Sequence, residues 1–131
     1  MLTAQAVMTE DVVTIRPDSS IQEAIELLLK LGISGLPVTD EEGHLVGIVT
    51  EFALLAIAYD DQVREENVSQ HMTTDVLTVD ADAPVNKVAD LCIAHRVRRV
   101  PVIKGGRLVG LISRRDVLKS LCDAQAPTCT A

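Results

Sequence analysis

The sequence predicts an α/β fold built from two copies of one β-α-β-β-α unit. Three observations indicate this class: a motif of the first half recurs in the second, each half contains one amphipathic helical pattern, and short apolar runs flank each helix. Composition constrains the packing, because 47% of the 131 residues are hydrophobic but the chain has one Phe, one Tyr and no Trp. The core is therefore expected to consist of aliphatic side chains.

The recurring motif keeps its register along the chain. Met8-Thr9-x-Asp11-Val12 returns 64 positions later as Met72-Thr73-x-Asp75-Val76, and Pro37-Val38 returns at the same offset as Pro101-Val102. Leu45-Val46-Gly47 returns as Leu108-Val109-Gly110 at an offset of 63, which indicates a one-residue deletion in the preceding turn. The two halves are therefore expected to share one fold.

The elements of each half follow from local signals. Runs rich in β-branched residues predict opening strands at 12–15 and 76–79. Apolar residues spaced i, i+3, i+4, i+7 and i+8 predict a helix capped by Ser19 or Ser20 and ended by Gly32, with a counterpart that opens at 82–84. Paired apolar runs predict two hairpins, 36–39 with 45–49 and 100–103 with 108–112. A helix is expected to close each half, at 50–59 and at 113–122.

The expected domain boundaries follow the repeat. The first unit is placed at 7–60, a polar linker at 61–70, the second unit at 71–122 and a flexible tail at 123–131. A unit of about 60 residues is close to the lower limit for a domain that is stable alone. The two units are therefore expected to share a core.

Composition and charge argue against several classes of function. The formal net charge of −7 and the shortage of aromatic residues argue against a nucleic-acid partner. No apolar run approaches the roughly 18 to 20 residues that cross a bilayer, and the N-terminus lacks a signal-peptide pattern, so no membrane association and a cytoplasmic location are expected. The charge is uneven: residues 1–66 have a net charge of −10 and residues 67–131 have +3.

The chain resembles a tandem pair of CBS (cystathionine-β-synthase) domains, also called a Bateman module, from about Val7 to Leu121. The second half contains the family signature as Gly110-Leu111-Ile112-Ser113-Arg114-Arg115-Asp116, preceded by Arg98-Arg99-Val100-Pro101-Val102. The resemblance implies two units that are related by a pseudo-twofold axis and packed sheet to sheet. It also implies a homodimer, and the surplus leucines of the first helix with residues 52–57 would suit a symmetric apolar contact.

The resemblance implies a regulatory module that binds AMP, ADP or ATP, with S-adenosylmethionine or NAD as further options, and controls an unidentified partner protein. A Ser or Thr that opens a helix can donate a hydrogen bond to a phosphate, where the helix dipole also favours an anion. An Asp three residues later could accept hydrogen bonds from the ribose hydroxyls. The main site would use Val12, Val13, Ser34, Gly35, Arg98, Pro101, Leu111, Ile112, Ser113, Arg115 and Asp116.

A second, weaker site is implied on the first signature, Gly47-Ile48-Val49-Thr50-Glu51-Phe52-Ala53. Besides Ser34 and Arg98, this site would use Ile48, Val49, Thr50, Val76, Leu77 and Arg99. The signature departs from the family pattern, because Ala53 stands where the ribose-binding Asp is expected. A hydrogen bond to a charged group contributes roughly 1.5 to 3 kcal/mol, so its loss would weaken binding about tenfold to a hundredfold.

Simpler interpretations of these residues remain open. Asp116 could only stabilise the first turn of its helix, Ser113 could only cap it, and the arginines of the second half could form a solvated face or contact an acidic protein. The whole chain could be a structural or protein-interaction module without physiological nucleotide binding. No catalytic motif and no metal-ligand spacing of histidines is present in the sequence, so neither an enzyme nor a metal site is expected.

Overall fold

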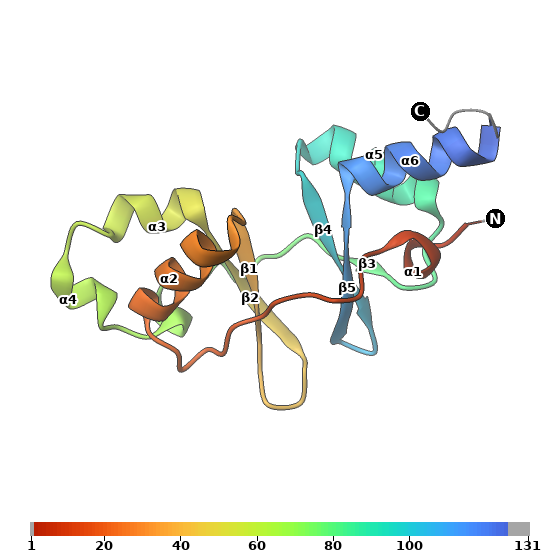
Figure 1. Ribbon diagram of the computed structural model, residues 1–131. Coiled ribbons are helices and arrows are strands. Elements are labelled where there is room, and N and C mark those ends of the chain that lie inside the picture. The colour runs from red at the N-terminus through yellow and green to blue at the C-terminus, as the bar shows by residue number, and fades with distance from the viewer. Residues whose placement is uncertain (1, 126–131) are drawn as a thin grey trace. The chain divides into compact units, whose positions relative to one another are not determined.

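The computed structural model describes residues 2–125 and divides the chain into two compact units. The central unit comprises residues 13–76. Within the described residues, the terminal unit combines residues 2–12 with residues 77–125. Each unit contains a small sheet and helices packed against it, which confirms the α/β class (Figure 1).

The central unit is built on one antiparallel hairpin. Its elements in chain order are α2 (Ile21–Leu31), β1 (Gly35–Thr39), β2 (Leu45–Thr50), α3 (Glu51–Ile57), α4 (Asp61–Arg64) and the 3₁₀ helix η1 (Val68–Gln70). The Ser20 hydroxyl caps α2 by accepting a hydrogen bond from the Glu23 amide at 3.1 Å. Gly32 ends this helix with a φ of +65°, a left-handed conformation that suits glycine. The expected start and end of this helix are confirmed.

The terminal unit is built on a three-stranded sheet. Its elements are α1 (Ala4–Val7), β3 (Val79–Asp80), α5 (Val85–His95), β4 (Arg99–Lys104), β5 (Arg107–Ser113) and α6 (Arg114–Gln125). Strand β3 pairs parallel with β4, and β4 pairs antiparallel with β5. The expected hairpins and closing helices of both halves are therefore confirmed.

Each hairpin is extended on its last strand by a segment from the start of the other repeat. In the terminal unit, Thr9 exchanges two backbone hydrogen bonds with Leu111 of β5, with N···O distances of 2.8 and 3.0 Å. In the central unit, Thr73 does the same with Ile48 of β2, at 2.8 and 2.9 Å. We call residues 8–12 the N-terminal arm and residues 72–76 the middle arm.

Both arms pass over a glycine of the signature. A Cβ atom built on Gly110 would lie 2.8 Å from Met8 Cγ and 2.9 Å from the Thr9 carbonyl oxygen. A Cβ atom on Gly47 would lie 2.9 Å from Met72 Cγ. Such distances are shorter than real Cβ atoms show, so these positions require glycine for the arm to approach.

The opening strands are shorter than the sequence predicts. Of 12–15, only Ile15 makes a parallel bridge, to Val38 of β1, and the segment 76–79 contributes only the start of β3. The chain passes from one unit to the other at 12/13 and at 76/77. Because each opening segment changes unit along its length, only its last residues pair with the hairpin that follows.

The compact units begin and end at different residues from the two units expected from the repeat, 7–60 and 71–122. Residues 7–12 pack with the terminal unit, and 71–76 pack with the central unit. The expected linker, 61–70, contains α4 and η1, and Val68 within it is fully buried. Helix α6 continues to Gln125, so the rest of the expected tail, 126–131, lies outside the described residues.

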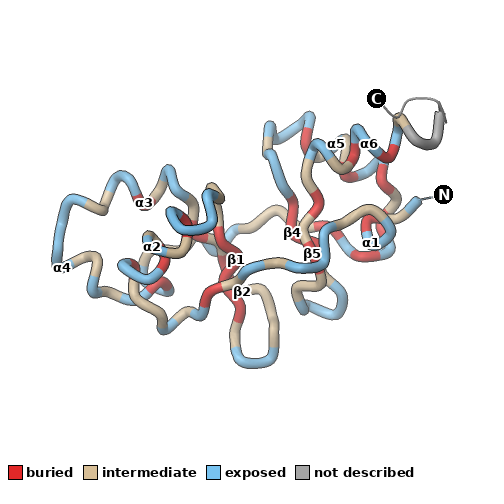
Figure 2. Tube along the Cα trace, in the orientation of Figure 1, coloured by how far each residue is buried: buried red, intermediate tan, exposed pale blue. Residues whose placement is uncertain are grey.

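Each unit has its own aliphatic core (Figure 2). The central core contains the buried residues Ile15, Ile21, Ala24, Leu28, Leu36, Val38, Val49, Leu54 and Val68. The terminal core contains Ala4, Val79, Ala81, Ala83, Val85, Val88, Cys92, Val100, Val102, Ile112 and Val117. Neither described core contains an aromatic residue, as the composition predicts.

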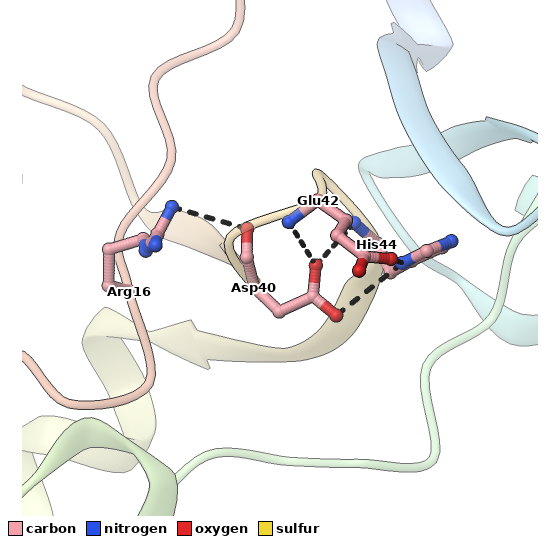
Figure 3. Close-up of polar contacts among 4 residues, drawn as sticks. All are labelled: Arg16, Asp40, Glu42 and His44. Atoms are coloured by element: carbon pink, nitrogen blue, oxygen red, sulfur yellow. Dashed lines mark hydrogen bonds and ion pairs between the residues drawn. The ribbon is translucent and has the colours of Figure 1, made fainter.

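The β1–β2 turn is held by one carboxylate (Figure 3). Asp40 Oδ1 accepts hydrogen bonds from the backbone amides of Glu42 and His44, both at 2.9 Å. Asp40 Oδ2 lies 3.5 Å from His44 Nδ1, and the Arg16 guanidinium donates to the Asp40 carbonyl at 3.3 Å. The His44 amide is the main cause that lowers the pKa of Asp40 from 3.8; partial burial opposes it, and the Glu42 amide adds to it.

We expect the Asp40 carboxyl to titrate below pH 3.8 in the folded protein, because its charged form accepts two amide hydrogen bonds. Its folded pKa is lower than its unfolded pKa, so its stabilising contribution is complete above about pH 3.8 and disappears as pH falls through the folded value. Side-chain ¹³C NMR titration measures the midpoint. In Asp40→Asn, the acid dependence of unfolding should be weaker; a midpoint at or above 3.8 would contradict the assignment.

Candidate functional site

The residues expected to bind ligand divide between the two units. The terminal unit holds Val12, Leu77, Arg98, Arg99, Pro101, Leu111, Ile112, Ser113, Arg115 and Asp116. The central unit holds Val13, Ser34, Gly35, Ile48, Val49, Thr50 and Val76. Each of the two expected sites therefore takes residues from both units.

The start of α6 is organised by a reciprocal pair of hydrogen bonds. The Asp116 amide donates to Ser113 Oγ at 3.0 Å, and the Ser113 amide donates to Asp116 Oδ2 at 2.9 Å. This is a capping box, so the capping roles that the sequence left open for Ser113 and Asp116 are both present. A carboxylate offers about four acceptor positions, so one bond to the Ser113 amide leaves capacity for ribose hydroxyls.

The same helix start is tied to the beginning of β4. The Arg114 amide donates to the Arg98 carbonyl at 2.9 Å, and in the central unit the Glu51 amide donates to the Ser34 carbonyl at 2.8 Å. These bonds hold Arg98 beside the capping box and Ser34 beside the start of α3. Arg98 and Ser34 therefore occupy equivalent backbone positions in the two units. Arg98 is exposed, and Ser34 is partly buried.

The arms place further expected residues in the same compact unit as each helix start. Thr9 binds Leu111, so the N-terminal arm, which ends at Val12, belongs to the unit that contains Ser113. Thr73 binds Ile48, so the middle arm, which ends at Val76, belongs to the unit that contains Thr50. The next residue after each arm belongs to the other unit: Val13 lies in the central unit and Leu77 in the terminal unit.

Three expected site residues have buried side chains. Ile112 and Val49 are core residues with 0% and 1% exposure, and Pro101 is buried within β4. Any contact of Ile112 or Val49 with a ligand would therefore use backbone atoms. The alternation of strand residues explains this, because Leu111 and Ser113 lie on the opposite face of β5 from Ile112.

The two helix starts differ chemically. Thr50 Oγ1 caps α3 by accepting a hydrogen bond from the Ala53 amide at 3.2 Å. Ala53 provides no carboxylate for the reciprocal bond that Asp116 makes in α6. The difference also extends to charge: the central unit has three basic and twelve acidic residues, and the terminal unit has nine basic and seven acidic residues. The terminal unit is thus the more favourable environment for an anion.

The described residues, 2–125, lack two other features. No group of three or more His, Cys, Asp and Glu side chains there could hold a metal ion. No helix in this range has the length and apolar character that a membrane crossing requires.

Ser113→Ala is expected to destabilise the chain by about 1 kcal/mol in the absence of ligand, because it removes the side-chain cap from α6. Urea unfolding followed by circular dichroism measures this loss. Ser113→Thr should retain most of the stability since it keeps the hydroxyl. Equal losses in both variants would contradict a capping role.

The support of the site by the arms was not anticipated from the sequence. Met8 and Thr9, with Gly110, form the contact that holds Leu111 in place, and the second repeat of the motif does the same for Ile48. The available signal was that the Met-Thr pair and the signature glycine both recur. Recurrence alone could not show that each pair contacts the glycine of the other half.

Comparison with known proteins identifies the family to which this fold belongs. The family model of the CBS domain matches residues 4–60 and again residues 68–123. The inosine-5'-monophosphate dehydrogenase of Methanocaldococcus jannaschii is 39% identical over 117 residues, which are 88% of this chain and 23% of that enzyme. This chain thus spans about a quarter of the length of that relative.

Two solved structures resemble the fold closely. The chain is similar to CBSX2, a CBS-pair protein of Arabidopsis thaliana, in a structure of its complex with AMP; the TM-score is 0.85 and the identity 28%, over 95% of this chain and 99% of that one. It is also similar to the CBS domain pair of protein MJ0100 in complex with 5'-methylthioadenosine and S-adenosyl-L-methionine, with a TM-score of 0.78 and 27% identity over 95% and 99% of the chains. With two matched domains that cover most of its length, the chain belongs to the CBS domain family as a tandem pair.

Proposed function

We propose that this chain is a regulatory module that binds an adenosine nucleotide, AMP, ADP or ATP, at the start of α6 and controls a separate partner protein. The observation that carries the proposal is the Ser113–Asp116 capping box, which places a hydroxyl and a carboxylate one helical turn apart beside Arg98. The complexes of CBSX2 with AMP and of MJ0100 with adenosine compounds support this ligand class.

The proposed roles follow from the chemistry of each group. The Ser113 hydroxyl and the amino end of α6 bind phosphate, with Arg98 and Arg115 as nearby cations. The Asp116 carboxylate accepts hydrogen bonds from the ribose. Val12 with the backbone of Leu111 contacts the base. We propose Val13, Ser34 and Gly35, which belong to the central unit, as further members of this site.

The site on the first signature is proposed to be weaker. Thr50 can contact a phosphate there, but Ala53 offers no acceptor for a ribose hydroxyl. The acidic surroundings of the central unit also disfavour an anion. We therefore propose one strong and one weak nucleotide site in each chain, in a protein that acts as a homodimer and does no catalysis itself.

Asp116→Ala is expected to weaken AMP and ATP binding about tenfold to a hundredfold, because it removes a charged acceptor that contributes roughly 1.5 to 3 kcal/mol. Isothermal titration calorimetry on the full chain measures the change. Asp90→Ala, which removes an exposed acid from α5, is the matched control and should bind like wild type. Unchanged affinity in Asp116→Ala would refute the site assignment.

The reverse substitution tests the weaker site. Ala53→Asp should strengthen nucleotide binding there about tenfold or more and also complete a capping box with Thr50.

Thermal shift with AMP, ADP, ATP, S-adenosylmethionine and NAD tests the function as a whole, since a ligand at 100 times its dissociation constant stabilises the folded protein by about 2.7 kcal/mol. The absence of a shift with every compound would favour a protein-interaction module, the alternative suggested by Ala53.

A further inference from the structure

Met8 and Met72 occupy the same position of the two repeats, and the proposed nucleotide site uses neither of them. Apart from the first residue, they are the only methionines of the chain. In the terminal unit, the Met8 amide donates to the Ala4 carbonyl at 2.9 Å and ends α1. In the central unit, the Met72 amide donates to the Val68 carbonyl at 2.9 Å, just after η1. Each methionine therefore joins a short helix to the arm that follows it.

Each thioether fills the space beside the signature glycine of its own unit. A Cβ atom built on Gly47 would lie 2.6 Å from Met72 Sδ, and a Cβ atom on Gly110 would overlap Met8 Sδ. Met8 also packs against the terminal core and Met72 against the central core. The sulfur atoms thus lie in contacts that leave no room for another heavy atom on the glycine side.

Oxidation of these sulfur atoms would add a polar oxygen to a tight apolar contact. Met8 and Met72 are only partly buried, so a small oxidant can reach them from solvent. The new oxygen has no space towards the glycine, and against the apolar core it would lose its hydrogen bonds to water. It is accommodated when the side chain turns outward, which removes the contact that holds the arm against the hairpin.

We propose that Met8 and Met72 are a matched pair of oxidation sites, at which a peroxide converts the thioether to a sulfoxide and so loosens the arm. With hydrogen peroxide, the sulfur donates an electron pair to one peroxide oxygen, an S–O bond forms and the O–O bond breaks. The other oxygen leaves as water with both hydrogens, so sulfur is oxidised and the peroxide is reduced. Methionine sulfoxide reductases, one for each epimer, reverse the change.

The loosening of the arms is independent of nucleotide binding. Its effect on ligand affinity rests on the proposed function, because Leu111 of the proposed main site pairs with Thr9 of the N-terminal arm. Oxidation of Met8 should therefore weaken the main site, whereas oxidation of Met72 acts on the arm that pairs with Ile48 of the weaker site.

Treatment of the full chain with hydrogen peroxide, followed by reduction of its thiols with dithiothreitol, tests the proposal. Peptide mass spectrometry should find one added oxygen on Met8 and one on Met72. Without nucleotide, hydrogen exchange should accelerate about tenfold or more at the backbone amides that pair each arm with its hairpin. Treatment with both methionine sulfoxide reductases should restore the slow exchange.

Met8→Leu and Met72→Leu are matched controls, because leucine has a similar volume, resists oxidation and leaves every cysteine in place. After peroxide treatment, exchange should accelerate only at the middle arm in Met8→Leu and only at the N-terminal arm in Met72→Leu. The double variant should not respond. A response of the double variant would overturn the proposal by assigning the effect to other groups. Slow exchange at both arms of a chain whose two methionines are oxidised would also overturn it, as would methionines that react only after unfolding in urea.

Calorimetry with AMP on Met72→Leu, before and after peroxide treatment, measures the consequence for the proposed main site. The affinity should fall about tenfold when Met8 is oxidised. A chain that binds no AMP before oxidation would contradict the proposed function, and hydrogen exchange would still decide whether the two methionines control the arms. Unchanged affinity together with accelerated exchange would contradict only the link between the N-terminal arm and the nucleotide site.

Discussion

Leu36→Ala is expected to lower the free energy of unfolding by about 3 kcal/mol, within the range of 2 to 5 kcal/mol found for buried leucines. Leu36 has 0% exposure and packs in the central core among other aliphatic residues. With no aromatic ring in that core to move into the space, the cavity is expected to persist. Equilibrium urea unfolding followed by circular dichroism measures the loss, and the Tm should fall by about 10 °C.

Leu29→Ala is the matched control, because it removes the same atoms from a side chain that is 74% exposed on α2. Its effect should remain within about 0.5 kcal/mol. Similar losses in the two variants would show that the burial of Leu36 does not determine the stability of the central unit.

Gly110→Ala is expected to destabilise the terminal unit by about 2 kcal/mol and to loosen the N-terminal arm. The added Cβ would lie 2.9 Å from the Thr9 carbonyl oxygen, a backbone atom that cannot rotate away. Inserting a methyl group into such a contact typically costs about 1 to 3 kcal/mol. Hydrogen exchange should accelerate at the Thr9 and Leu111 amides, which pair across this contact.

Gly35→Ala provides the matched control for the glycine substitution. Its Cβ would meet Val49 O at 3.5 Å, an ordinary van der Waals contact, so stability should be unchanged or slightly higher. The double variant Met8→Ala, Gly110→Ala should recover part of the lost stability, because the Met8 side chain is the other group that the added Cβ would contact too closely. Slow exchange at Thr9 in Gly110→Ala would contradict the role assigned to this glycine.

The helices and hairpins could be predicted because their signals are local. Ser20 and Gly32 lie at the two ends of α2, and the two hairpin turns fall where the sequence predicts them. Caps and turns depend on a few neighbouring residues, whose conformational preferences act at short range. The short helices α1 and α4 were missed, because four residues are too few to show a helical period.

The site was predicted in part. Ser113 and Asp116 lie together because both belong to one helix turn, a relation that spacing alone determines. The resemblance implies site roles for Ile112 and Val49 but does not indicate that their side chains are buried, which strand alternation could have indicated. The nucleotide itself remains a proposal.

The sequence by itself determined that the chain contains two related α/β repeats, that their cores are aliphatic and that the second signature has an acid which the first lacks. Only the tertiary structure decided that the segment which opens each repeat packs on the hairpin of the other repeat, so that compact units and repeats do not coincide. The physical reason is that a repeat shows which residues are equivalent but not which copy they contact. That choice depends on long-range backbone pairing and on the close approach that Gly47 and Gly110 allow.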